Sequence, residues 1–320
     1  MTTAKKRIVL AGATGYIGRA VAAELLDRGH ELIAIVRDPA AAISGGETRL
    51  ADVTDAAGLS AALAQTTFDA VISCIASRTG VPDDAWRVDC EANRNLLATA
   101  LRQDARQFIL LSAICVQKPR LAFQYAKLAF EADLVASGID YTIVRPTAFF
   151  KSLSGQVERV RKGKSFLIFG DGTETACKPI GRGDLARYLV DCLDDPSARG
   201  AILPIAGPGE ALTPREQGQM LFELADMPPQ FRRVPPQLFR VATAALAPLG
   251  TFWPAAARKA ELARIGHYYA TESMLVWDEA RGEYDAGSTP STGKERLRDH
   301  YARMLHSESP GKDLGSHKLF

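Results

Sequence analysis

The stretch 7-RIVLAGATGYIG-18 decides the fold, because it joins an apolar run to a glycine-rich turn and then to a helical pattern. Residues 7-RIVLAG-12 read as a buried strand, and a helix is predicted to follow through about Leu26. The turn 12-GATGYIG-18 has Gly-x-x-Gly-x-x-Gly spacing. Glycines allow a tight turn and close backbone approach, and the helix N-terminus adds free N–H groups and a partial positive charge. The stretch therefore predicts a phosphate-binding loop for a nucleotide, although glycines also mark ordinary strand–helix turns.

The same alternation of strand and helix continues through the first half of the chain. Further apolar, β-branched runs that read as strands stand at 32–37, 70–77, 107–114 and 140–146. A long helix is expected over about 84–103. Continuous apolar strands separated by helices indicate a parallel sheet covered on both faces. The fold class we predict is therefore α/β, with a doubly wound parallel sheet of the Rossmann type.

The composition changes after about Pro146, where the loops become rich in glycine and proline. Residues 184–195 and 201–207 still read as a helix and a strand that return to the first sheet. We expect substrate-lining segments at about 147–180. The predicted division is a dinucleotide-binding domain, a smaller substrate-binding cap and a polar tail, over residues 1–207, 208–305 and 306–320.

Composition limits the classes of function. The 39 basic and 37 acidic residues give a net charge of +2, which does not suggest a nucleic-acid partner. The 5 cysteines are scattered without a CxxC pair, so we expect reduced thiols in a cytoplasmic protein. The histidines show no HExxH or similar spacing, and no protein-bound metal is expected.

No segment approaches the roughly 20 apolar residues needed to span a bilayer. The most apolar stretch, 238–259, is interrupted by Arg240, Pro248, Gly250 and Pro254. It is compatible with a helix in a core, in a pocket wall or at a membrane surface. Because a strand is predicted close to the N-terminus, we expect no signal peptide.

The end of the second strand, 35-IVRD-38, predicts which dinucleotide binds. NAD-binding proteins usually place Asp or Glu there to accept a hydrogen bond from the ribose 2′-hydroxyl. Arg37 stands instead where a 2′-phosphate would lie, and a guanidinium holds that dianion through paired hydrogen bonds. Asp38 follows and leaves NADH open, but the pattern favours NADPH.

A second stretch, 122-AFQYAKLAFE-131, bears on catalysis. Short-chain reductases place tyrosine and lysine one helical turn apart, as Tyr-x-x-x-Lys. Here Phe123 stands four residues before Lys127, and the tyrosine is Tyr125. Two residues are about 200° apart around a helix, so Tyr125 and Lys127 are not expected to face one substrate atom.

Longer motifs in the second half carry a more specific resemblance. They are 145-RPTAFFKSLSGQVERVRKGKSFLIFGDG-172, 176-ACKPIGRGDLA-186, 212-LTPREQGQMLFE-223 and 272-ESMLVWDEARGEYDAGSTPSTGKERL-297. With the glycine loop, they resemble the atypical short-chain dehydrogenase/reductase proteins and, among these, the NADPH-dependent 8-vinyl reductases of divinyl chlorophyllide. The resemblance runs from about residue 5 to about residue 305.

This resemblance implies a reaction. Hydride from NADPH and a proton saturate the 8-vinyl group of divinyl chlorophyllide to 8-ethyl, in chlorophyll and bacteriochlorophyll synthesis. It implies a bacterial cytoplasmic enzyme, because plant relatives carry a plastid-targeting extension. Peripheral contact with the photosynthetic membrane, or with another enzyme of pigment synthesis, remains open.

The resemblance also implies site residues. A vinyl group has no carbonyl oxygen at the reacting carbon, so its reduction depends less on a phenol placed to donate a proton. Lys127 matches the lysine of the broader family and is expected to hold the nicotinamide ribose, while Tyr125 is the weaker candidate for proton donor. The expected cofactor contacts are Gly12, Ala13, Thr14, Gly15, Tyr16, Ile17, Gly18, Arg37, Asp52, Val53, Cys74, Ser112, Lys127 and Pro146. The expected pigment contacts are Phe123, Phe149, Phe150, Lys151, Cys177, Lys178 and Met274.

Each pigment contact has a plainer alternative, because phenylalanine, methionine and unpaired cysteine also fill cores and lysine is usually solvated. Trp277 is assigned to the core, and His267 is a weak candidate for an axial ligand of the pigment's magnesium. Two other functions remain open: a non-catalytic NADPH-sensing regulator, and a reductase or epimerase of another small molecule such as a nucleotide sugar. Enzymes of the latter kind usually keep Tyr-x-x-x-Lys.

Overall fold

The computed structural model describes residues 4–306, which form two compact units. Unit 1 comprises the chain up to Pro146 together with Arg182–Pro204. Unit 2 comprises Thr147–Gly181 together with the chain from Ile205 onward. The substrate-lining segments expected within the dinucleotide-binding domain therefore group with the second unit.

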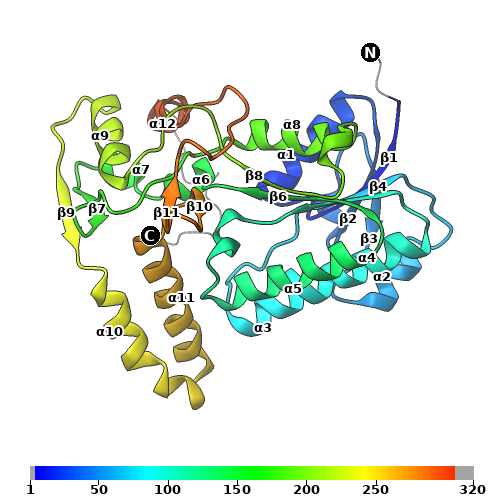
Figure 1. The fold of residues 1–320 in the computed structure, drawn as a ribbon, viewed down its shortest axis with the longest axis horizontal. Helices are drawn as coiled ribbons and strands as arrows, with labels where there is room; N and C mark the ends of the chain where they lie inside the picture. Colours follow the sequence, from blue (N-terminus) through cyan, green and yellow to red (C-terminus); the bar gives the residue numbers. More distant parts are fainter. Residues whose placement is uncertain (1–3, 307–320) are drawn as a thin grey trace. The chain divides into compact units, whose positions relative to one another are not determined.

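Unit 1 is built on a seven-stranded sheet with the order β3-β2-β1-β4-β5-β6-β8 (Figure 1). Its strands are β1 Arg7–Ala11, β2 Glu31–Val36, β3 Glu47–Leu50, β4 Ala70–Ser73, β5 Gln107–Leu111, β6 Asp140–Pro146 and β8 Ala201–Ile205. Every pairing from β3 through to β6 is parallel. The strand order reverses at β1, which lies between β2 and β4, and ligands of such sheets bind outside the carboxyl ends of the strands at this point. The predicted doubly wound α/β fold is confirmed.

Helices cover both faces of this sheet, α1 and α8 on one face and α2, α4 and α5 on the other (Figure 1). Their bounds are α1 Tyr16–Asp27, α2 Ala56–Ala62, α3 Pro82–Ala85, α4 Ala92–Arg102, α5 Ala122–Ala136 and α8 Arg182–Asp191. Short 3-10 turns are η1 Pro39–Ala41, η3 Ile114–Gln117 and η4 Pro196–Ala198. The long helix expected over 84–103 is interrupted by a π-helical segment, η2 Trp86–Glu91. The main core lies between the sheet and α4 and α5, where Phe108 and Phe130 pack with ring centroids 5.8 Å apart.

Unit 2 has its own core and two small sheets. Its elements are α6 Phe150–Leu153, α7 Val157–Arg161, β7 Phe166–Phe169, α9 Pro214–Leu224, β9 Phe231–Val234, α10 Gln237–Leu246, η5 Pro248–Thr251, α11 Pro254–Thr271, β10 Val276–Asp278, β11 Glu283–Asp285 and α12 Leu297–His306. Strand β7 pairs with β9 in parallel and β10 with β11 in antiparallel. Phe150, Phe166, Phe222 and Tyr301 fill one core, which explains why the segment before Gly181 belongs to this unit.

The predicted tail, 306–320, lies outside the described residues except for His306. Trp277, which we assigned to the core, is only partly buried and packs edge-on against Tyr284 with ring centroids 4.9 Å apart. Within residues 4–306, no helix is long and apolar enough to span a membrane.

Candidate active site

The glycine loop connects β1 to α1 at the point where the strand order reverses. Gly12 has a φ of +80°, and a Cβ there would lie 2.6 Å from the Cys74 carbonyl oxygen. A Cβ on Gly18 would lie 2.0 Å from the Gly12 carbonyl oxygen, so helix and turn pack closely only with glycine. Gly15 donates its N–H to the Gly12 carbonyl at 2.9 Å and is the N-cap residue of α1.

The N-terminus of α1 is shaped for an anion. No side chain caps it, and its first turn contains no acidic residue. Thr14 and Gly15 are exposed, while Tyr16 is half-buried with the Arg182 guanidinium 5.4 Å from its ring centroid. Ala13, Ile17 and Gly18 are buried and pack the turn against the interior of the unit. The free N–H groups and positive end of this helix suit the pyrophosphate of a dinucleotide.

Arg37 follows the last residue of β2 and is exposed. Within residues 4–306 it forms no hydrogen bond or ion pair. Asp38 accepts a hydrogen bond from the Ala40 N–H at 2.9 Å, which occupies part of its carboxylate in capping η1. Hydrogen bonds from Thr54 and the charge of Arg37 lower the pKa of Asp52. A cationic side chain thus stands where a ribose 2′-substituent is expected, and the neighbouring carboxylate of Asp38 is already engaged.

Lys127 is buried on α5 and forms an ion pair with Asp89. Its Nζ lies 2.8 Å from the Asp89 Oδ1, and the two side chains are 10% and 0% exposed. Asp89 lies in the π-helical segment η2, a feature frequent at functional sites. The Asn93 side chain donates to the Asp89 carbonyl at 3.0 Å and accepts from the Ser73 hydroxyl at 2.5 Å. Asn93 of α4 and, through it, Ser73 of β4 thus help to fix the segment that carries Asp89.

Tyr125 lies on the exposed side of α5, with 49% of its surface accessible. Its hydroxyl donates to the Pro119 carbonyl at 3.0 Å. Phe123, one turn before Lys127, is half-buried and packs against the main core of unit 1. The structure therefore separates Tyr125 from Lys127, as the 200° spacing predicts.

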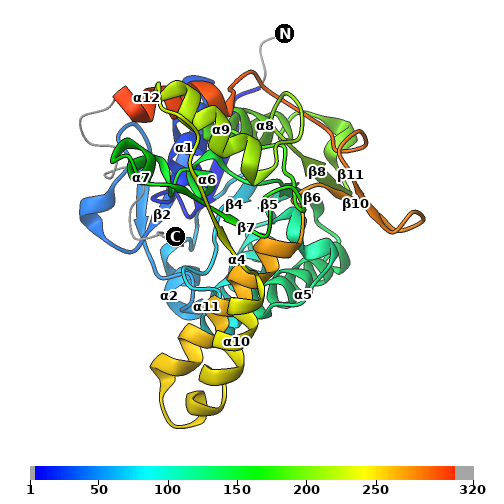
Figure 2. The same ribbon diagram turned by 90° about the vertical axis from the view of Figure 1, so that its left-hand side faces the viewer.

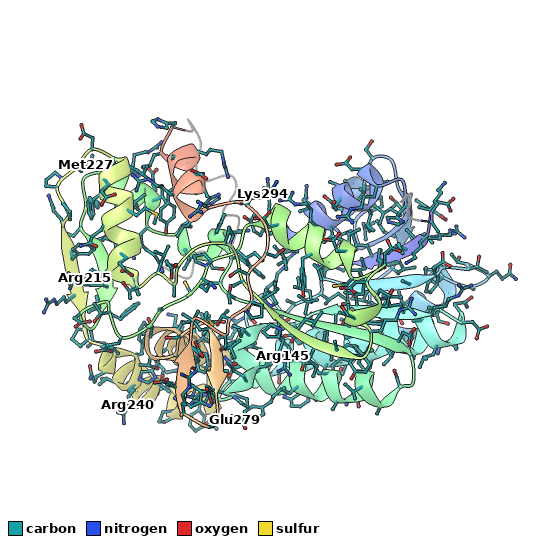
Figure 3. The ribbon with its side chains drawn as sticks, turned by 45° about the horizontal axis from the view of Figure 1, so that its top comes forward. Arg145, Arg215, Met227, Arg240, Glu279 and Lys294 are labelled. Carbon is teal, nitrogen blue, oxygen red and sulfur yellow. The ribbon has the colours of Figure 1, made fainter. Side chains whose placement is uncertain are left out.

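Ser112 follows β5 and is buried. Its hydroxyl donates to the Glu131 carboxylate, which also forms an ion pair with Arg145 on β6 (labelled in Figure 3). This arrangement ties β5, α5 and β6 together at the carboxyl edge of the sheet. The Ser112 hydroxyl is thus used inside the fold, as is its backbone N–H, which donates to the Val144 carbonyl at 2.8 Å.

The other expected cofactor residues line the same edge of the sheet or support it. Cys74 directly follows β4 and donates its backbone N–H to the Ala11 carbonyl at 2.9 Å. Desolvation raises the pKa of its thiol to about 12, so it is an unreactive thiol. The Val53 carbonyl accepts from Asn95 at 3.1 Å, and Pro146 is the last residue of β6.

In unit 2 the structure brings four of the expected pigment residues onto neighbouring segments. Cys177 forms backbone bridges with Leu212 and Met274, and Phe149 forms one with Ile180. The Lys178 ammonium donates to the Thr289 carbonyl at 3.0 Å. That ammonium is therefore partly engaged by the protein. Burial raises the pKa of the Cys177 thiol to about 12.

Phe150 and Lys151 differ from this group. Phe150 is 1% exposed inside the core of unit 2 and packs against His300 with ring centroids 5.4 Å apart. Its packing accounts for it without a ligand, in line with the plainer alternative. Lys151 is half-buried in the first turn of α6.

Comparison with known proteins gives the family. Residues 12–196 match the NAD(P)H-binding family. A Cucumis sativus protein named divinyl chlorophyllide a 8-vinyl-reductase, chloroplastic, is 45% identical over 98% of this chain and 79% of that relative. The Oryza sativa subsp. indica protein of the same name is 44% identical over 98% of this chain and 82% of the relative. The chain belongs to the divinyl chlorophyllide a 8-vinyl-reductase family.

A solved structure supports the fold of this reductase family member. The NADPH-dependent quinone oxidoreductase of Escherichia coli, crystallised with NADPH, has a TM-score of 0.68 at 20% identity. The match covers 93% of this chain and 99% of the other. At this identity, the similarity establishes the shared Rossmann-type fold.

Sequence reasoning missed two buried carboxylates of the 8-vinyl-reductase candidate site. Asp89 partners Lys127, and Glu131 joins Ser112 to Arg145. Asp89 stands in a segment that reads as ordinary helix, so nothing in the local pattern marks it. Glu131 stands four residues after Lys127, and that spacing on one helix face was the available signal.

Proposed function

We propose that this protein reduces the 8-vinyl group of 3,8-divinyl chlorophyllide a to an 8-ethyl group, with NADPH as cofactor. The observation that carries the proposal is 45% identity to a named 8-vinyl-reductase across 98% of the chain. NADPH, when bound, supplies the hydride. The proton that completes the reduction would come from the solvent, and the residues of the chain would bind and orient the reacting groups.

The nucleotide end fits a phosphorylated dinucleotide. Gly12 has no side chain, and no side chain caps the N-terminus of α1, so the pyrophosphate can lie close to the backbone. Arg37, without a hydrogen-bond partner in residues 4–306, would hold a 2′-phosphate through charge-assisted hydrogen bonds. These features support NADPH over NADH.

Lys127 would bind the ribose hydroxyls on the nicotinamide side. Asp89 fixes the position of the ammonium, since the pair is 2.8 Å apart and shielded from water. The remaining ammonium protons are available to a hydroxyl acceptor. Asp89 is thus a positioning residue in this proposal.

Acid catalysis by Tyr125 is not part of the proposal. Its phenol is exposed and donates to Pro119. Negative charge that develops on reduction of a conjugated vinyl group spreads over the macrocycle. The reaction therefore does not depend on one precisely placed proton donor. The chain then contributes orientation more than proton transfer.

For the pigment we propose Phe149, Lys178 and Met274 of unit 2, with Cys177 beside them. Phe123 of unit 1 stays a separate candidate for a pigment contact. The segments that carry the first four are bridged to one another or follow directly in sequence. A cytoplasmic location is also proposed, because all five cysteines are free thiols.

The test is an anaerobic incubation of the purified protein with divinyl chlorophyllide a and either NADPH or NADH, followed by chromatography of the pigments. We expect conversion to the 8-ethyl pigment with NADPH and much less with NADH. NADPH binding without pigment conversion would overturn the proposal and favour an NADPH-sensing regulator. Conversion of a nucleotide sugar instead would favour the other alternative.

A further inference from the structure

Helices α10 and α11, joined by η5, form a helical hairpin in unit 2. The two helices lie side by side and project away from the small sheets of that unit (Figures 1 and 2). The inner face of α10 is used for packing: Phe239 lies 5.0 Å from Phe169 by ring centroids. A Cβ on Gly266 of α11 would lie 2.6 Å from the Phe239 ring, so the helices are in close contact.

The outer face of the hairpin is apolar and exposed, which is unusual for a helix of a globular protein. Its exposed apolar residues come from three successive segments: two stand three positions apart on α10 and share one face of that helix, one lies in η5, and two lie between η5 and α11. They are Leu238 at 55%, Val241 at 64%, Leu249 at 43%, Phe252 at 79% and Trp253 at 62% exposed. No residue of α10 is fully buried. The two most prominent aromatic residues lie together at the turn between the helices, which we call the tip.

Positive charge surrounds this apolar face. Residues 235–271 contain four basic residues and one acidic residue, a net charge of +3. The acidic residue, Glu261, is paired with Arg264 at 2.8 Å. Arg240 (Figure 3), Arg258 and Lys259 are exposed and have no ion-pair partner among residues 4–306. Lys259 follows Trp253 by six residues, which is roughly 9 Å along a helix axis.

We propose that the hairpin docks on the surface of an anionic lipid bilayer, with Phe252 and Trp253 inserted between the headgroups. If the tip enters along the axis of α11 to about 5–10 Å, the depth to which apolar faces of interfacial helices are buried, Arg258 and Lys259 lie at the level of the phosphates. Tryptophan is enriched at that level of membranes, and basic residues near it are attracted to anionic lipid. A second copy of the chain fits less well, because pairing two such faces brings two like charges of +3 together.

The experiment is sedimentation of the full-length protein with vesicles of phosphatidylglycerol and phosphatidylcholine, against vesicles of phosphatidylcholine alone. No cofactor or pigment is added, so the result is independent of the proposed function. We expect binding to the anionic vesicles that weakens with salt, and a blue shift of tryptophan emission on binding. Trp253→Phe should bind nearly as well but lose most of that shift.

Two variants separate the contributions. Phe252→Ser with Trp253→Ser should weaken binding about a hundredfold, since two large apolar side chains no longer insert. Arg258→Gln with Lys259→Gln should weaken it about thirtyfold. The matched control is Arg161→Gln with Lys162→Gln, a pair on or next to α7 that changes net charge equally and should bind like the unchanged protein.

Three results would overturn the proposal. One is no sedimentation with anionic vesicles at low salt. Another is equal weakening by the hairpin charge variant and its control, which would make the attraction a property of net charge. The third is a dimer in solution that the tip variant converts to a monomer, which would assign the apolar face to a second copy.

Discussion

Asp89→Asn tests the buried ion pair at the centre of the proposed site. The Asp89 and Lys127 side chains are 0% and 10% exposed, so the neutral amide leaves a buried ammonium without its counter-charge. Breaking a buried pair by removing one partner costs about 3–5 kcal/mol. The asparagine oxygen still accepts a hydrogen bond, and we expect the lower end, about 3 kcal/mol.

The assay is urea denaturation followed by circular dichroism, with the midpoint and slope compared between variants. Asp133→Asn is the matched control. Asp133 pairs with Arg94 at 2.6 Å, but these side chains are 39% and 49% exposed, so the same substitution should cost less than about 1 kcal/mol. Lys127→Met in the Asp89→Asn background should recover about 2 kcal/mol, because the unpaired charge is removed.

NADPH affinity gives a second measurement. If Asp89 positions Lys127 for the ribose, Asp89→Asn should weaken NADPH about tenfold while Asp133→Asn leaves it unchanged. Equal free-energy costs for Asp89→Asn and Asp133→Asn would show that the pair is not shielded from water. Unchanged NADPH affinity in the Asp89 variant would remove its positioning role.

Three further outcomes are expected. Arg37→Ala should weaken NADPH roughly tenfold to a hundredfold by titration and NADH hardly at all, because only the 2′-phosphate accepts from the guanidinium; equal weakening would contradict its role. Tyr125→Phe should keep most of the reductase activity, since its phenol donates to the backbone, and near-complete loss would identify it as the proton donor. His30 is buried, accepts from the Lys6 N–H at 3.2 Å, and has a pKa lowered by desolvation, so the unfolded chain binds its proton more readily. Stability should therefore be full above about pH 6.5 and fall as the pH drops below it, and His30→Gln should flatten that part of the curve.

The fold could be predicted because its signals are local. Apolar runs and the glycine turn fix β1, α1, β2, β4, β5 and β6, and the structure has all of them. Strand β3 and helix α2 were not predicted, because both are short. Strand β3 reads ETRL, which has no apolar run, and it is at most half-buried at the edge of the sheet. The interruption of the long helix by η2 also lacked a signal in the sequence.

The sequence by itself determined the dinucleotide-binding fold, the family and the cationic residue at Arg37, because each depends on residues adjacent in the chain. It also predicted that Tyr125 and Lys127 face apart, which follows from helical geometry alone. The tertiary structure decided that Asp89, 38 residues before Lys127, is its partner. It likewise decided that Phe150 belongs to a core and that the apolar stretch 238–259 presents an exposed face. These outcomes depend on which distant segments pack together, and burial and pairing across such distances leave no mark on the local pattern.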